Sequence, residues 1–65
     1  MFVEAYLPIG INQAFTYHVP SDLESQVHKG SIIQVPFGSR QSFAYVDKVI
    51  SKNPYPGQTK TIISI

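Results

Sequence analysis

Residues Gly30–Ile50 read GSIIQVPFGSRQSFAYVDKVI, and this stretch holds the clearest β-strand patterns in the chain. In Ser42–Ile50 the residue types alternate with a period of two, which places successive side chains on opposite faces of a strand. Ser31–Val35 is rich in β-branched residues and is expected to stop at Pro36-Phe37-Gly38-Ser39. The stretch therefore predicts two strands joined by a turn that contains Pro and Gly.

Three more strands are predicted on either side of this stretch. The first is Phe2–Leu7, where Pro8 ends the ladder, and the second is Ala14–Val19. We expect these two strands to pair as a hairpin, because turn-forming residues lie between them. The last strand is expected over Lys60–Ile65.

The rest of the chain predicts turns and one short helical segment. Ser21–Lys29 is polar, and the spacing of Ser21 and Glu24 is that of a capping box for one short helical turn. Lys52–Gly57 is expected to be a turn-rich loop. No window has the apolar spacing of a longer helix. The predicted fold class is all-β: a small five-stranded barrel of the OB or SH3-like kind with one short helical turn.

The length of 65 residues indicates a single domain spanning residues 1–65. A chain of this size buries only about 60 % of its unfolded surface, so it has no room for a separate catalytic domain. Because it opens with Met and ends inside a predicted strand, we expect it to be the amino-terminal part of a longer protein.

Composition and motifs argue against several kinds of function. The chain has no Cys, and His18 and His28 are its two histidines, so no convincing set of metal ligands is present. It has no nucleophile elbow, no paired carboxylates on one face and no phosphate-binding loop. The net charge is +1, and no signal peptide or membrane segment is apparent. We expect a soluble, non-catalytic binding domain without a metal or cofactor of its own.

The aromatic residues could form stacking platforms for bases or simply fill the core. Phe15 and Phe43 are expected in the core, whereas for Tyr17 a ligand role and a core role are equally open. Phe37 is interpreted as a turn anchor rather than a pocket wall. Gly38 could serve a turn with positive φ, a close approach of ligand to backbone, or both.

The basic side chains are interpreted as solvated surface charges unless several of them meet at one rim, where they could bind phosphates. They include Arg40, Lys48, Lys52 and Lys60.

Several short motifs together resemble the amino terminus of PriA, the family of replication-restart helicases also called primosomal protein N′. Phe15 follows Pro8 by seven residues, and Val35 follows Tyr17 by eighteen. The resemblance covers almost the whole chain, and the order and spacing of its motifs make it specific. The motifs are Leu7-Pro8-Ile9, Phe15-Thr16-Tyr17, Val19-Pro20, Gly30-Ser31, Val35-Pro36-Phe37-Gly38 and Ala44-Tyr45-Val46.

The resemblance implies a β-rich domain that captures the 3′ terminus of the nascent leading strand at a stalled replication fork. It implies a pocket for the terminal nucleotide formed by Phe15, Thr16, Tyr17 and Gly38, with Lys60 as the pocket lysine. The family often carries Asp where this chain has Thr16, so a neutral hydroxyl replaces a carboxylate.

The resemblance also implies a bacterial cytoplasmic protein in which the attached helicase is brought to the fork for primosome assembly and replication restart. ATP and zinc would be bound only by parts downstream of these residues. The implied partners are DNA with a free 3′ end, the stalled fork, the remainder of the helicase and other primosome proteins.

Two other functions remain open on the sequence. An SH3-like interaction module could bind a Pro-rich peptide in a groove lined by Tyr17, Tyr45 and Tyr55. An OB-type binder of internal single strands would need an open row of exposed aromatic residues and more basic charge than this chain has.

Overall fold

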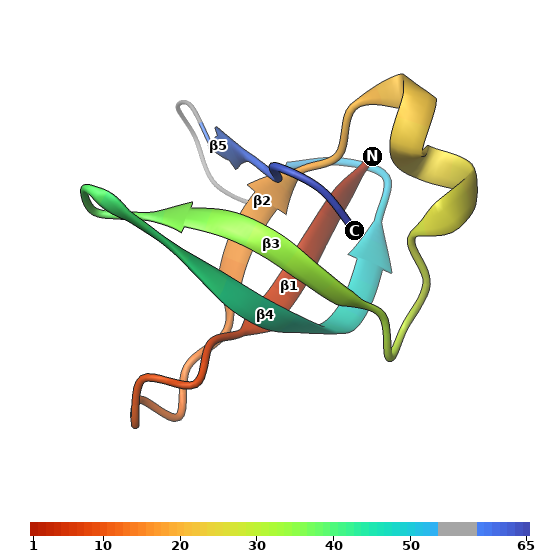
Figure 1. The fold of residues 1–65 in the computed structure, drawn as a ribbon. Helices are drawn as coiled ribbons and strands as arrows, with labels where there is room; N and C mark the ends of the chain where they lie inside the picture. The colour runs from red at the N-terminus through yellow and green to blue at the C-terminus, as the bar shows by residue number, and fades with distance from the viewer. Residues whose placement is uncertain (54–58) are drawn as a thin grey trace.

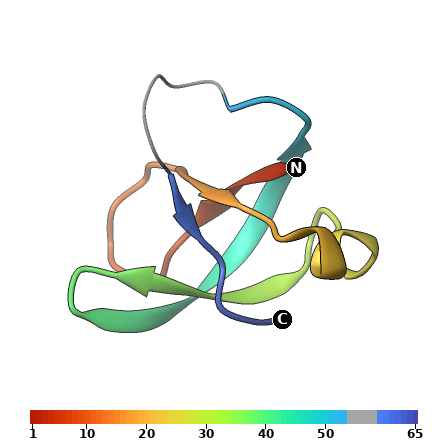
Figure 2. The same cartoon turned by 90° about the horizontal axis from the view of Figure 1, so that it is seen from above.

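The computed structural model describes residues 1–53 and 59–65, which form one strongly curved β-sheet (Figure 1). The sheet has the strand order β3-β4-β1-β2-β5, in which β2 and β5 are parallel and the other neighbours antiparallel. It curls into a half-barrel, as the view from above shows (Figure 2), and this confirms the predicted small all-β fold. The strands are β1 (Phe2–Tyr6), β2 (Phe15–His18), β3 (Ile32–Phe37), β4 (Arg40–Ile50) and β5 (Lys60–Thr61).

The short helical segment is a 3-10 helix, η1 (Ser21–Gln26), so the prediction of one helical turn is confirmed. The predicted capping box is wrong, because the N-cap residue is Pro20 and no side chain caps the helix. A carboxylate oxygen of Glu24 lies instead 3.3 Å from the N-terminal amine of Met1. The Glu24 carboxylate therefore pairs with the start of the chain, next to β1, and does not cap η1.

Strand β3 continues through Pro36 and Phe37, so the prediction that it stops at Pro36 is wrong. The backbone N–H of Gln34 donates to Ser64 at 2.8 Å and therefore points away from β4. Position 36 has the same orientation because directions alternate along a strand, so proline removes no donor from the β3–β4 ladder. The strand then reverses through Gly38 and Ser39, with Gly38 at φ +62°.

The core of the half-barrel is mainly aliphatic. Phe43, which was predicted to lie in the core, is 64 % exposed. It pairs in register with Gln34 on the outer face of the sheet, while its neighbour Ala44 is buried. The inward side of β4 is therefore the set that contains Ala44 and Val46. The buried residues are Val3, Ala5, Leu7, Tyr17, Val19, Val27, Ile33, Val35, Ala44, Val46 and Ile62.

The chain after β5 joins the two edges of the curled sheet. The predicted strand over Lys60–Ile65 pairs with β2 only as Lys60–Thr61, and the chain then crosses to the free edge of β3. There the N–H of Ile63 donates to Gln34 at 2.7 Å. The curl of the sheet brings this free edge close enough for the backbone to change partners. The loop predicted over Lys52–Gly57 lies mostly outside the described residues.

The two adjacent isoleucines of β3 provide a matched test of this inside–outside pattern. Ile33 is 1 % exposed and Ile32 is 55 % exposed. We expect Ile33→Ala to lower the free energy of unfolding by about 2–5 kcal/mol, because it leaves a cavity in the core. Ile32→Ala should cost less than about 1 kcal/mol. Urea unfolding of both variants checks this, and equal losses would contradict the assignment of faces.

Candidate nucleic-acid interface

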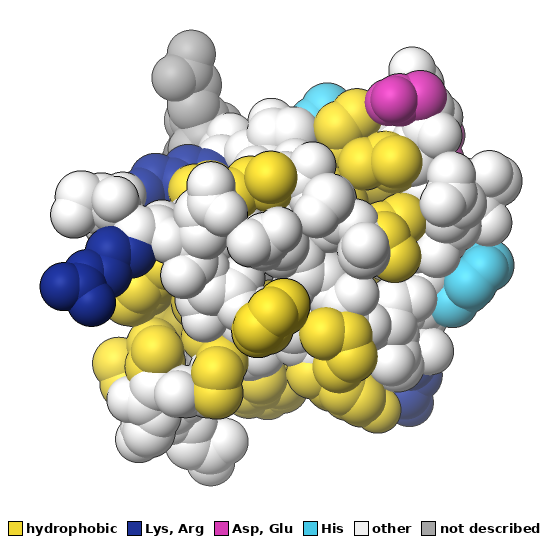
Figure 3. Space-filling model, viewed as in Figure 1, with side chains coloured by type: hydrophobic (Ala, Val, Ile, Leu, Met, Phe, Trp, Pro, Cys, Tyr) yellow, Lys and Arg dark blue, Asp and Glu magenta, His cyan; other side chains and the backbone are white. Residues whose placement is uncertain are grey.

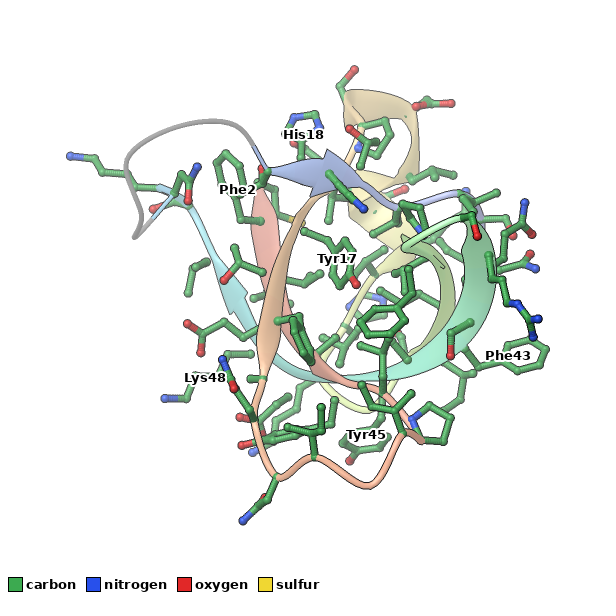
Figure 4. The ribbon with its side chains drawn as sticks, turned by 90° about the vertical axis from the view of Figure 1, so that its left-hand side faces the viewer. Phe2, Tyr17, His18, Phe43, Tyr45 and Lys48 are labelled. Atoms are coloured by element: carbon green, nitrogen blue, oxygen red, sulfur yellow. The ribbon has the colours of Figure 1, made fainter. Side chains whose placement is uncertain are left out.

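A cavity of about 420 Å³ lies where β2, the β3–β4 turn and β5 come together. Figure 4 looks at the side of the molecule that lies on the left in Figure 1, where the β3–β4 turn is. All of the site residues implied by the resemblance line this cavity, and Lys60 is the one charged residue among its described lining residues. They are Phe15, Thr16, Tyr17, Gly38 and Lys60.

One wall of the cavity is formed by two phenylalanine rings. The rings of Phe15 and Phe37 meet edge to face, with centroids 5.8 Å apart and an interplanar angle of 76°. Phe15 is half-buried against the core, as predicted, and Phe37 is 37 % exposed. Phe37 therefore both ends β3 at the turn and lines the cavity. The pair presents an apolar surface of the kind on which a nucleobase can pack.

Tyr17 contributes to the cavity mainly from inside the core. It is only 4 % exposed, and it pairs in register with Val3 on one side and Lys60 on the other. Its hydroxyl donates a hydrogen bond of 3.3 Å to the carbonyl oxygen of Pro36. This bond connects the β2 wall to the β3 wall. In Figure 4 the ring of Tyr17 points into the middle of the curled sheet.

Thr16 is placed differently from its two aromatic neighbours. It pairs in register with Glu4, and directly opposed residues in antiparallel strands share a face, here the outer one. Thr16 thus lines the cavity from a position on the outer face of β2. A carboxylate at position 16 would stand opposite the Glu4 carboxylate, and like charges in that position destabilise a sheet. This pairing gives a physical reason for a neutral residue at position 16.

Gly38 and Lys60 lie on separate elements that border the cavity. A β-carbon added at Gly38 would meet no heavy atom within 4 Å, so the space beside this backbone is open. Its φ of +62° lies in the region that L side chains rarely adopt. Gly38 thus meets both of its predicted descriptions, a turn glycine and a bare stretch of backbone beside a cavity. Lys60 is exposed on β5.

A comparison with protein families matches residues 4–65 to the 3′ DNA-binding domain of PriA. The chain belongs to this family. The match confirms the resemblance and shows that the chain is a DNA-binding domain of the PriA type rather than a catalytic one. Searches of curated proteins and of solved structures found no match.

Pro36 and Phe37 line the cavity of this PriA-type domain, although neither is predicted as a site residue and Phe37 is interpreted from the sequence as a turn anchor. Three further lining residues are not predicted either: Gln13, Ala14 and Thr59. Gln13 and Ala14 precede β2, and Thr59 precedes β5. They belong to connecting segments without a recognisable motif, so position in the fold is the only property that distinguishes them.

The outer face of the sheet carries a separate apolar surface. Ile32, Tyr45 and Tyr6 follow one another in register across β3, β4 and β1, and each is exposed. Figure 3 shows hydrophobic side chains gathered over the lower half of one face of the molecule. The cavity beside Tyr45 and Phe43 has no charged residue among its described lining residues. A surface of this kind lacks the cations that a binder of internal single strands requires.

The peptide groove predicted for an SH3-like module is not assembled from its expected residues. Tyr17 lies in the core and lines one cavity, whereas Tyr45 lines the cavity on the outer face. Tyr55 lies outside the described residues.

Residues 1–53 and 59–65 contain no group of three or more His, Cys, Asp or Glu side chains arranged to hold a metal ion. Within the same residues, no helix is long and apolar enough to cross a membrane.

Burial of Tyr17 predicts a specific loss of stability at alkaline pH. Burial desolvates the phenolate and raises the pKa of Tyr17 above its usual 10.0. As the pH rises, the unfolded chain therefore loses the Tyr17 proton before the folded protein does. The contribution of the protonated Tyr17 to the free energy of unfolding is intact below about pH 10 and is lost as the pH rises above that value. Between about pH 8 and pH 11 we expect the wild type to lose more free energy of unfolding than Tyr17→Phe, which cannot titrate.

Urea unfolding at the two pH values measures this difference. The comparison with Tyr17→Phe removes the effect of the other tyrosines and the lysines, because they titrate in both proteins. Equal losses in the two proteins would show that Tyr17 ionises as easily in the folded state as in the unfolded chain.

Proposed function

We propose that this PriA-type domain captures the 3′ terminus of a DNA strand in the cavity between β2, the β3–β4 turn and β5. At a stalled replication fork, that terminus is the end of the nascent leading strand. The observation that supports the proposal is convergence: residues from three distant parts of the sequence, Phe15–Tyr17, Gly38 and Lys60, border a single cavity.

The cavity offers different chemistry to different parts of a terminal nucleotide. The edge-to-face pair of Phe15 and Phe37 provides an apolar wall for the base. The bare backbone at Gly38 lets the edge of the base approach main-chain donors and acceptors, since no side chain fills that space. Backbone groups accept different bases with small shifts, so this recognition would depend weakly on sequence.

Lys60 supplies the positive charge of the cavity. Its ammonium group can form a charge-assisted hydrogen bond to the terminal sugar or its phosphate. The domain has a net charge of only +1, and one terminal nucleotide offers few phosphates, so binding should depend weakly on salt. Selectivity would then come from the shape of the cavity: a strand that continued past the terminal sugar would collide with its wall.

We further propose that end capture positions an attached ATP-dependent helicase of the PriA type at the fork, in the bacterial cytoplasm, for primosome assembly and replication restart. Binding of an end places the attached protein at the fork junction, whereas binding along a strand would leave it free to slide. In this proposal the ATP and zinc sites belong to other parts of such a protein.

The state of the 3′ end should decide the affinity for DNA. We expect an oligonucleotide with a free 3′ hydroxyl to bind about tenfold or more tightly than one with a 3′ phosphate, because the added group collides with the cavity wall and replaces a hydroxyl hydrogen bond. Fluorescence anisotropy measures both affinities. An oligonucleotide with a 5′ phosphate and a free 3′ hydroxyl is the control, because it carries the same added charge. Equal affinities for the 3′-phosphate and 5′-phosphate forms would contradict the proposal of end capture.

A comparison of substitutions at Gly38 and Gly10 distinguishes the effect of backbone strain from a role of Gly38 in binding. Both have positive φ, +62° and +77°, and an added β-carbon meets no atom within 4 Å at either position. Each Gly→Ala substitution should therefore lower stability by about 1–2 kcal/mol. Gly10 does not line the cavity. We expect Gly38→Ala to weaken binding of the free 3′ end several-fold and Gly10→Ala to leave it unchanged. Similar affinities for the two variants would assign Gly38 to the turn alone.

A further inference from the structure

Arg40 stands beside the cavity without belonging to its lining. It is the first residue of β4 and is directly opposite Phe37, the residue whose ring forms part of the cavity wall. Only Gly38 and Ser39 separate Phe37 from Arg40 along the chain. The backbone of Arg40 is therefore fixed at the rim of the cavity, and its side chain is exposed to solvent.

A second cation borders the cavity on another element. Lys60 lies on β5, in register with Tyr17 of β2. Thus one basic residue stands at the start of β4, beside the β3–β4 turn, and one stands on β5. Arg and Lys side chains are among the groups that contact DNA phosphates. In Figure 3 basic side chains lie along the left edge of the molecule, the side of the β3–β4 turn and β5 in Figure 1, and another lies at the lower right.

Neither cation is neutralised by an acidic neighbour in the described part of the chain. The one ion pair within residues 1–53 and 59–65 joins Met1 to Glu24, beside η1. The magenta acidic side chains visible in Figure 3 lie at the upper right, where Figure 1 shows the helix, across the molecule from the basic edge. On the outer face, Glu4 lies in register with Lys48 on one side and Thr16 on the other.

We propose that Arg40 binds a phosphodiester group of the DNA strand just 5′ to the captured terminal nucleotide. The inference rests on the proposed function, because it assigns the direction in which the strand leaves the cavity: over the β3–β4 turn, past Arg40. The planar guanidinium group can bind two phosphate oxygens at once, and an exposed turn position leaves it free to do so. Arg40 is thus a positioning residue for the strand, while Lys60 serves the terminal nucleotide.

The test uses Arg40→Gln and two forms of one oligonucleotide with a free 3′ hydroxyl. One form has phosphodiester linkages throughout, and the other has neutral methylphosphonate linkages next to its 3′ end. We expect Arg40→Gln to weaken binding of the first form about fivefold to tenfold at low salt. It should lower the slope of log affinity against log salt by about 0.7. Binding of the methylphosphonate form should not change.

Lys48→Gln is the matched control, because it removes the same charge elsewhere. Lys48 pairs in register with Glu4 and points away from the half-barrel in Figure 4. A second variant, Arg40→Lys, keeps the charge and should retain the salt slope. Thermal unfolding by circular dichroism verifies that both Arg40 variants are folded.

Arg40 does not bind the phosphodiester next to the captured nucleotide if Arg40→Gln weakens binding of both oligonucleotides equally. The same conclusion follows if Arg40→Gln weakens binding no more than Lys48→Gln does. This failure is distinguishable from failure of the proposed function. If the wild type distinguishes free from blocked 3′ ends and Arg40→Gln has no effect, only the path of the strand is wrong. If the wild type does not distinguish those ends, both the end capture and the role of Arg40 are overturned.

Discussion

The hydrogen bonds between Gln34 and the segment after β5 join the two edges of the sheet, and the positions of the cavity walls depend on them. Ile63 donates to Gln34 at 2.7 Å, and Gln34 donates to Ser64 at 2.8 Å. Strand β5 pairs with β2 over only two residues, so that pairing alone is too short to fix its position. Because Lys60 is on β5 and Gly38 is on the β3–β4 turn, this closure sets the separation between two sides of the cavity. The hydrogen bond from Tyr17 to Pro36 is a second connection across the cavity, between β2 and β3.

A chain of 65 residues leaves little material for a dedicated site, and this domain builds its site from residues that also maintain the fold. Tyr17 fills the core and braces two walls of the cavity. Phe37 ends β3 and contacts Phe15, and Gly38 makes the turn possible. Among the five predicted site residues, only Lys60 has an exposed polar side chain whose role is separable from folding. Such economy limits the substitutions that can change binding while leaving stability unaffected.

Period-two patterning and the Pro and Gly positions were sufficient to predict five strands, the hairpin of β1 with β2, and the turn at Gly38, but not the ends of β3 and β5. They could not predict which side of β4 faces inward, because both sets of alternating residues contain apolar side chains; Phe43 was assigned to the core and lies outside it. The failure at Pro36 has a similar origin. Whether a strand tolerates proline depends on the direction of the missing N–H, and only the neighbouring strands decide that direction.

The site shows the same division between local pattern and tertiary structure. The motifs identified the family, and the resemblance implied five of the residues that line the cavity, since motif spacing is a property of the chain. Tertiary structure alone decided that Thr16 faces Glu4, that Tyr17 acts from the core, and that Arg40 stands at the rim. The physical reason is that cross-strand register and sheet curvature arise from contacts between residues far apart in the chain. By itself, the sequence determined which segments become strands and where they turn; the closed sheet decided which side chains share a space.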